Sequence, residues 1–174
     1  CETMSGVRRG GASGGRVEAR GVALAELGDV GAAVDLWGGG GRGGGAASSE
    51  AWMVALGGNP PVVRARIQAA YDTVAALDGV DGQKMGAIGF CFGGLCAILS
   101  ARMGLELAGI VSFHGLLKVG EEALETKPKA RMLIQHGQDD PMAPPADVGA
   151  FAEEMKRIDA DWVLHAYPGV AHAF

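Results

Sequence analysis

Residues 86–94 have the sequence GAIGFCFGG, in which a cysteine, Cys91, lies among glycines. The apolar segment 84–91 is too short for an isolated helix and predicts a strand buried on both faces. Residues 92–104 then predict a helix that ends at Gly104. A strand that enters a helix through Gly-x-Cys-x-Gly must turn sharply, and glycines remove the side chains that would collide there. The stretch therefore predicts either a tight packing turn or a turn that presents a reactive Cys91.

The chain downstream of this turn alternates between strand and helix patterns. Apolar segments predict strands at 107–115, 131–137 and 162–169, and an amphipathic pattern predicts a helix at 145–160. Strands that alternate with helices predict an α/β fold with a mostly parallel sheet and helices on both faces. In such sheets, functional residues gather in the loops that follow the carboxyl ends of the strands.

Upstream of the turn the patterns are weaker. Apolar residues at helical spacing predict a helix at about 61–78. Residues 22–27 predict the end of another helix, with Gly28 as its cap, and residues 30–37 predict a buried strand. Half of the 30 glycines lie in the first 50 residues, so this third is expected to be the least regular. The tract GGGGRGGG lacks a following Lys-Ser/Thr and predicts a loop, not a phosphate site.

Length and composition predict one α/β domain over residues 1–174, and the terminal residues suggest a piece of a longer chain, truncated at both ends. The net charge of −5 gives no reason to expect a nucleic-acid partner. No run of eighteen apolar residues and no signal peptide is recognisable, so we expect a cytoplasmic protein, monomeric and with no membrane partner. Three cysteines without paired or clustered spacing predict neither a disulfide framework nor a zinc site.

Three side chains form a candidate catalytic constellation. Cys91 is expected at a helix N-terminus, where free N–H groups favour a thiolate and the N–H of Phe92 can bind an oxyanion. A nucleophile of this kind needs a base and an acid that orients the base. Asp140 follows the strand at 131–137, and His172 follows the last strand. The order nucleophile, acid, histidine is the one that α/β-hydrolases use.

The segments AIGFCFGG (87–94), SFHG (112–115), HGQDDPMAP (136–144) and YPGVAHAF (167–174) resemble the dienelactone hydrolase family, the cysteine-dependent members of the α/β-hydrolase fold. The resemblance extends from about Leu24 to Phe174. It implies an enzyme that opens small lactones or esters and needs no metal or other cofactor. It also implies that Cys91 is the nucleophile, Asp140 the acid and His172 the base.

The resemblance implies two further residues in an early loop, a glutamate that pairs with the cysteine and a following residue whose N–H is the second oxyanion donor. Glu2 and Thr3 are the candidates in this chain. The arginines that bind substrate in the family are not assigned, and Arg42, Arg64 and Arg66 are the possibilities.

Other polar residues near these motifs have plainer interpretations. Asp139 also lies in the acidic turn, and such turns need no function, although the spacing in the family favours Asp140. His114 and His136 end strands and are expected to support the site, and His165 is expected to pack within a strand or line its rim. Cys96 is expected to be a small buried hydrophobe.

The expected reaction is hydrolysis of a lactone or activated ester of the dienelactone type through a Cys-His-Asp triad and a thioester acyl-enzyme. Two alternatives stay open at this stage. One is a carboxylesterase or thioesterase on the same fold. The other is an inactive fragment of such an enzyme, suggested by the glycine-rich opening and the expected truncation.

Overall fold

The structure is a computed structural model and describes residues 16–36, 51, 54, 58–118 and 127–174. The chain divides into two compact units, Cys1–Gly82 and Gln83–Phe174. One domain over residues 1–174 stays a prediction. None of the helices in the described ranges combines the length and the apolar character that a membrane span requires.

The N-terminal unit contains helices α1 (Arg16–Glu26) and α3 (Pro60–Ala75). The start of α3 is set by Asn59, whose side-chain oxygen accepts the N–H of Val62 at 3.4 Å. Such an N-cap satisfies a donor that the helix itself leaves unpaired. Val63 and Ile67 form its buried side. The helix predicted at 61–78 is therefore confirmed, although it ends three residues earlier than expected.

The strand predicted at 30–37 is wrong for residues 30–36, which the structure describes without a strand; Trp37 lies outside the described residues. Gly28 follows α1 with φ +98°, as expected for a helix end. Ala33 and Leu36 are buried, so the apolar pattern did indicate burial. A strand also needs a neighbour to pair its backbone groups. The described part of the unit contains no such neighbour, and the Leu36 carbonyl instead accepts a hydrogen bond from the Arg66 side chain.

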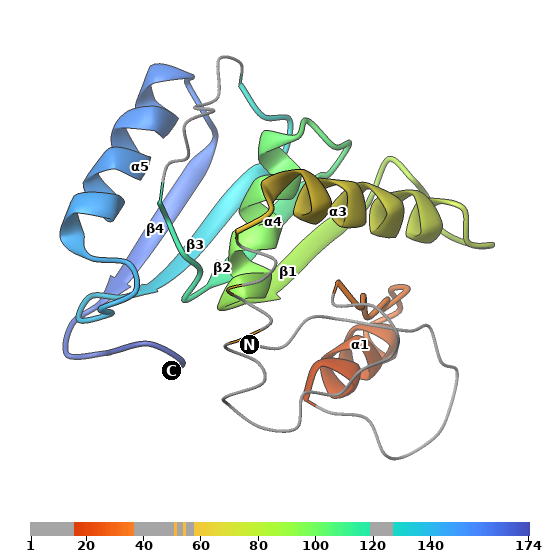
Figure 1. Ribbon diagram of the computed structural model, residues 1–174. Helices are drawn as coiled ribbons and strands as arrows, with labels where there is room; N and C mark the ends of the chain where they lie inside the picture. The colour runs from red at the N-terminus through yellow and green to blue at the C-terminus, as the bar shows by residue number, and fades with distance from the viewer. Residues whose placement is uncertain (1–15, 37–50, 52–53, 55–57, 119–126) are drawn as a thin grey trace. The chain divides into compact units, whose positions relative to one another are not determined.

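The C-terminal unit is built on a four-stranded parallel sheet, shown in Figure 1. Its strands lie in chain order: β1 (Gly86–Phe90), β2 (Gly109–Phe113), β3 (Arg131–Gly137) and β4 (Trp162–Tyr167). All four point the same way, so their carboxyl ends meet along one edge of the sheet. This arrangement confirms the predicted parallel α/β architecture.

Helices α4 (Phe92–Arg102) and α5 (Pro145–Arg157) belong to this unit. Right-handed connections between strands in sequential order bring both helices to the same face of the sheet. Arg102 of α4 forms a buried ion pair with Glu154 of α5, which joins the two helices directly. The core between helices and sheet consists largely of apolar side chains that are almost fully buried, namely Phe92, Ile98, Ile110, Ile134, Phe151 and Met155.

The prediction that β1 is buried on both faces is wrong. Ile88 is 37% exposed, and Gly86 is exposed as well. β1 forms one edge of the described sheet, and alternate residues of a strand point to opposite faces. Gly89 therefore faces α4, whereas Ile88 faces away from it.

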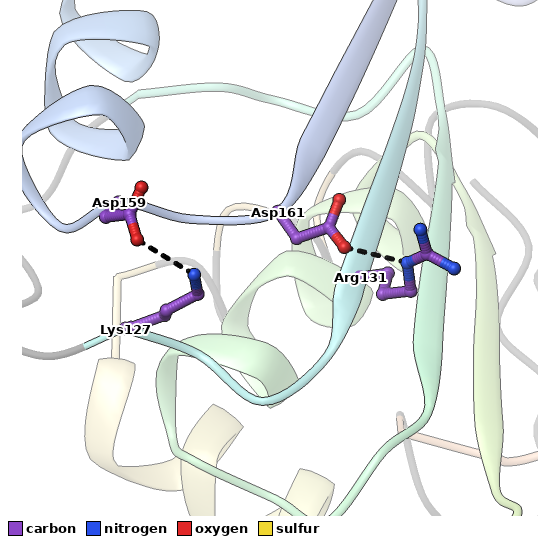
Figure 2. Close-up of polar contacts among 4 residues, drawn as sticks. All are labelled: Lys127, Arg131, Asp159 and Asp161. Carbon is purple, nitrogen blue, oxygen red and sulfur yellow. Dashed lines mark hydrogen bonds and ion pairs between the residues drawn. The ribbon is translucent and has the colours of Figure 1, made fainter.

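Two exposed ion pairs lie where β3 and β4 begin (Figure 2). Arg131 Nε donates to Asp161 at 2.8 Å, and Lys127 Nζ donates to Asp159 at 3.0 Å. Exposed pairs of this kind contribute only about 0–1 kcal/mol each. They lie at the amino ends of the strands, whereas Cys91 follows the carboxyl end of β1.

Candidate active site

Cys91 lies in the turn between β1 and α4. It is a non-glycine residue with φ +54°, a conformation that costs of the order of 1–3 kcal/mol and needs support from its surroundings. The Cys91 N–H donates to the Phe113 carbonyl at 3.0 Å, and the Cys91 carbonyl accepts the N–H of Leu95 at 3.1 Å. These bonds to β2 and α4 hold the strained residue in place.

The glycines of the motif allow the strand and the helix to approach closely. A Cβ atom on Gly89 would lie 1.9 Å from the Gly93 carbonyl oxygen, a distance that no side chain tolerates. Gly94 has a similarly close neighbour, because a Cβ there would lie 2.6 Å from the Ser112 hydroxyl. Gly-x-Cys-x-Gly therefore produces a turn in which Cys91 is presented at the start of a helix.

His172, from the segment after β4, links Cys91 to Asp140. Its Nε2 atom lies 3.2 Å from the Cys91 Sγ, and its Nδ1 atom lies 2.7 Å from the Asp140 Oδ2. The carboxylate fixes the tautomer, because Nδ1 must carry the proton to donate to it. Nε2 is then free to accept the thiol proton.

Asp140, rather than its neighbour, faces the histidine. Its side chain is fully buried, and its Oδ1 accepts the N–H of Met142 at 2.8 Å. Asp139 is exposed, and its N–H donates to the Val170 carbonyl two residues before His172. The acidic turn thus places the Asp140 side chain against His172, while the Asp139 backbone supports the segment that contains His172.

The protonation of Cys91 differs from the expectation at a helix N-terminus. Burial raises the pKa of the Cys91 thiol, the N–H of Phe92 opposes this, and the charge of Asp140 raises the pKa further. Cys91 is only 6% exposed, so the lost hydration of the thiolate exceeds what the helix N-terminus provides. Because its pKa is raised, the side chain is a thiol at neutral pH. Burial also raises the pKa of Cys96, to about 12, as expected for a cysteine that only packs.

His114 lies beside His172, where it can support the site as expected. Its ring meets that of His172 edge-on, with centroids 4.8 Å apart, and it is 7% exposed. Its pKa is lowered by burial and by His172, so it is neutral. The parallel register pairs Phe90 with Phe113, which places the next residues of both strands, Cys91 and His114, side by side. Aligning the ends of these two predicted strands was the way in which the sequence could have indicated this proximity.

The other predicted residues lie outside the described ranges, in the N-terminal unit, or elsewhere in the C-terminal unit. Glu2, Thr3 and Arg42 lie outside the described residues. Arg64 and Arg66 lie on α3 in the N-terminal unit. Phe92 is placed as predicted, with its N–H beside the Cys91 sulfur. His136 is buried next to the acidic turn, and burial lowers its pKa.

A sequence model of the dienelactone hydrolase family, compared with this chain, matches residues 15–174. The chain belongs to the dienelactone hydrolase family. This membership confirms the resemblance carried by the Cys91, Asp140 and His172 motifs.

Solved structures support the same family and fold. The chain is 31% identical to a dienelactone hydrolase-like promiscuous phosphotriesterase from metagenomic libraries, with a TM-score of 0.71. It is 36% identical to a protein called m3DLH, with a TM-score of 0.77. Each comparison covers 90% of this chain and 65% of the other chain. These similarities confirm the α/β-hydrolase fold of the dienelactone hydrolase family.

One curated relative is named as a lactonase. The chain is 30% identical over 118 residues to a protein of a Bradyrhizobium species named as a probable 2-oxo-3-(5-oxofuran-2-ylidene)propanoate lactonase. The match covers 62% of this chain and 47% of that protein. The chain thus spans about half the length of this relative.

Proposed function

We propose that this protein hydrolyses lactones or activated esters through a thioester acyl-enzyme on Cys91. His172 Nε2 takes the thiol proton, and the Sγ attacks the carbonyl carbon. The carbon–oxygen bond of the leaving group then breaks, and the imidazolium gives its proton to the departing oxygen. Water, deprotonated by His172, attacks the thioester and releases the acid, and the thiol of Cys91 is restored.

The observation that carries this proposal is the line of contacts from Sγ to Nε2 and from Nδ1 to the carboxylate, at 3.2 Å and 2.7 Å. A thiol with a raised pKa reacts slowly without a base in contact with it, and His172 is in contact. Asp140 stabilises the imidazolium that forms during the attack and keeps the ring in the productive tautomer.

The developing oxyanion requires donors that are in place before the reaction. The N–H of Phe92 lies next to the nucleophile and would be the first donor. Thr3 would supply the second N–H, and Glu2 would pair with the cysteine in the free enzyme. Both of these assignments rest on the family resemblance alone.

The nucleophile indicates the class of ester. A thiolate is itself a good leaving group, so the tetrahedral intermediate expels it in preference to a poor alkoxide. An enolate leaving group departs more readily, as in a dienelactone. Activated lactones and enol esters should therefore turn over faster than alkyl esters, and the lactonase relative supports this choice. A carboxylesterase or thioesterase activity is the alternative on the same residues.

A second candidate activity is the hydrolysis of activated phosphotriesters. It is favoured by the 31% identity to the promiscuous phosphotriesterase. Attack of Sγ at phosphorus with loss of an aryloxide would use the same base and the same oxyanion donor.

Initial rates with an enol lactone, an aryl ester, an alkyl ester and an aryl phosphotriester test both activities. We expect the enol lactone to be fastest and Cys91→Ala to abolish turnover, while the matched variant Cys96→Ala retains it. Alkyl esters that exceed the enol lactone would overturn the lactonase assignment. Full activity of Cys91→Ala would overturn the mechanism.

A further inference from the structure

Three potential metal ligands converge at the carboxyl edge of the sheet. The Sγ of Cys91 and one ring nitrogen each of His114 and His172 all lie within 4.8 Å of one another. The three come from the ends of β1, β2 and β4, and the strand pairing between β1 and β2 holds the first two in register. Of these three residues, the proposed hydrolase mechanism uses only Cys91 and His172.

The spacing fits a small tetrahedral cation. Zinc binds sulfur at about 2.3 Å and imidazole nitrogen at about 2.0–2.1 Å, so tetrahedral ligands lie roughly 3.3–3.6 Å from one another. The contact between the Cys91 Sγ and the His172 Nε2 is 3.2 Å, already close to this value. Ligands no more than 4.8 Å apart reach this spacing through a modest shift of one side chain.

The second ligand is already oriented as zinc requires. A histidine that binds a metal usually donates its other ring N–H to a carboxylate or carbonyl, which fixes the ring and raises its basicity. His172 does this through Nδ1 and the buried Asp140 at 2.7 Å. Its Nε2 lone pair therefore points towards Cys91, where a cation can replace the thiol proton.

The third ligand is His114, whose ring is buried. His114 is 7% exposed, and its Nδ1 finds no hydrogen-bond partner in any other described residue. A buried nitrogen without a partner is costly, and a bound cation or a water molecule is the usual remedy. A neutral imidazole offers the lone pair of one ring nitrogen to a metal.

We propose that Cys91, His114 and His172 form an inhibitory site for a thiophilic divalent cation such as Zn²⁺, with water in the fourth position. Thiolate and imidazole select zinc over magnesium and calcium, which prefer oxygen ligands. On binding, the Cys91 thiol releases its proton to solvent, and Nε2 directs its lone pair to the metal. The bound metal thus occupies both groups that the hydrolytic reaction needs. The metal site does not depend on the hydrolytic activity.

Direct metal binding to the full chain tests this proposal. Co²⁺ should give a thiolate-to-cobalt charge-transfer band, and Zn²⁺ should displace it with one ion per chain and suppress alkylation of Cys91 by iodoacetamide. Mg²⁺ should do neither. These readouts do not use turnover, so failure of the proposed hydrolase function leaves them interpretable.

His114→Asn is the decisive variant, because asparagine tolerates the φ of +39° found at this position. Loss of a supporting partner alone costs about 10–100-fold in metal affinity, so loss of this ligand should weaken Zn²⁺ binding by at least about tenfold. His165→Asn, at an exposed position of β4, is the matched control and should bind as the native chain does.

Circular dichroism melts of both variants establish that they fold. No cobalt–thiolate band in the native chain would overturn the proposal. Equal zinc affinity in folded His114→Asn and the native chain would overturn the role of His114.

Discussion

Gly89→Ala should disrupt the turn that carries Cys91. The added Cβ would lie 1.9 Å from the Gly93 carbonyl oxygen and 2.1 Å from its carbon, over 1 Å closer than side chains approach backbone. Neither neighbour can rotate away, because both are backbone atoms of α4. The strand and helix must separate, and such overpacking costs typically 1–3 kcal/mol and occasionally more. We expect a loss at the upper end, about 3 kcal/mol, since backbone must move.

The same movement should reduce catalysis in the molecules that remain folded. A displacement of about 1 Å at a reacting group can cost about 10²-fold in rate. The Cys91 Sγ lies 3.2 Å from the His172 Nε2, so a shift of that size breaks their contact. We expect kcat/KM to fall about 100-fold under conditions in which the variant is folded.

Urea unfolding and initial rates measure the two effects. Gly149→Ala is the matched control, because Gly149 lies in α5, where a Cβ would have no neighbour within 4 Å. Alanine in a helix interior should stabilise the chain by about 0.5–1 kcal/mol and leave kcat/KM unchanged. Gly89→Ala with native stability and native kcat/KM would refute the argument from close approach.

Three further predictions concern buried groups. Asp140→Asn should lower kcat by about 10³–10⁴-fold, because the amide disfavours the productive tautomer of His172. Asp139→Asn should leave kcat near native. Similar losses in both variants would contradict the assignment of Asp140 as the acid. Arg102→Met should cost about 3–5 kcal/mol in urea unfolding, because the buried Glu154 carboxylate loses the cation that pairs with it. Adding Glu154→Leu should recover most of that loss, and a double variant as unstable as the single one would count against the explanation. The pKa of Cys96 is raised to about 12 from 9.0, so its contribution to folding stability should be complete below pH 9 and fall by about 1.4 kcal/mol per pH unit above it. Cys96→Ala should therefore lose less folding stability than the native chain between pH 9 and 12. Parallel curves of stability against pH for the variant and the native chain would show that burial of the Cys96 thiol does not affect stability in this way.

Much of the site was predictable because parallel strands end at one edge. Cys91, Asp140 and His172 each follow a strand, so their convergence follows from the alternation of helices and strands. The choice between Asp139 and Asp140 did not follow from local pattern. It depends on which carboxylate the turn buries against His172, and only the family spacing favoured Asp140, the one that contacts it.

Other features depend on tertiary context that local sequence does not carry. An apolar run such as 84–91 looks the same in a central strand and in an edge strand, so the exposure of Ile88 was missed. The segment 30–36 buries Ala33 and Leu36, but it has no strand neighbour among the described residues and forms no strand. The helix N-terminus suggested a thiolate at Cys91, yet burial, which the motif does not report, has the larger effect on its pKa.

The central claim is that Cys91 is the nucleophile and that His172 is its base. The most direct test uses an enol or aryl ester whose acyl-enzyme deacylates slowly. The reaction is quenched in acid during turnover, and the mass of the intact protein and a peptide map show which residue carries the acyl group. We expect one acyl group per chain on Cys91, none on Cys96, and far slower acylation in His172→Ala. An acyl group at another residue, or acylation of Cys91 at the native rate in His172→Ala, would contradict it.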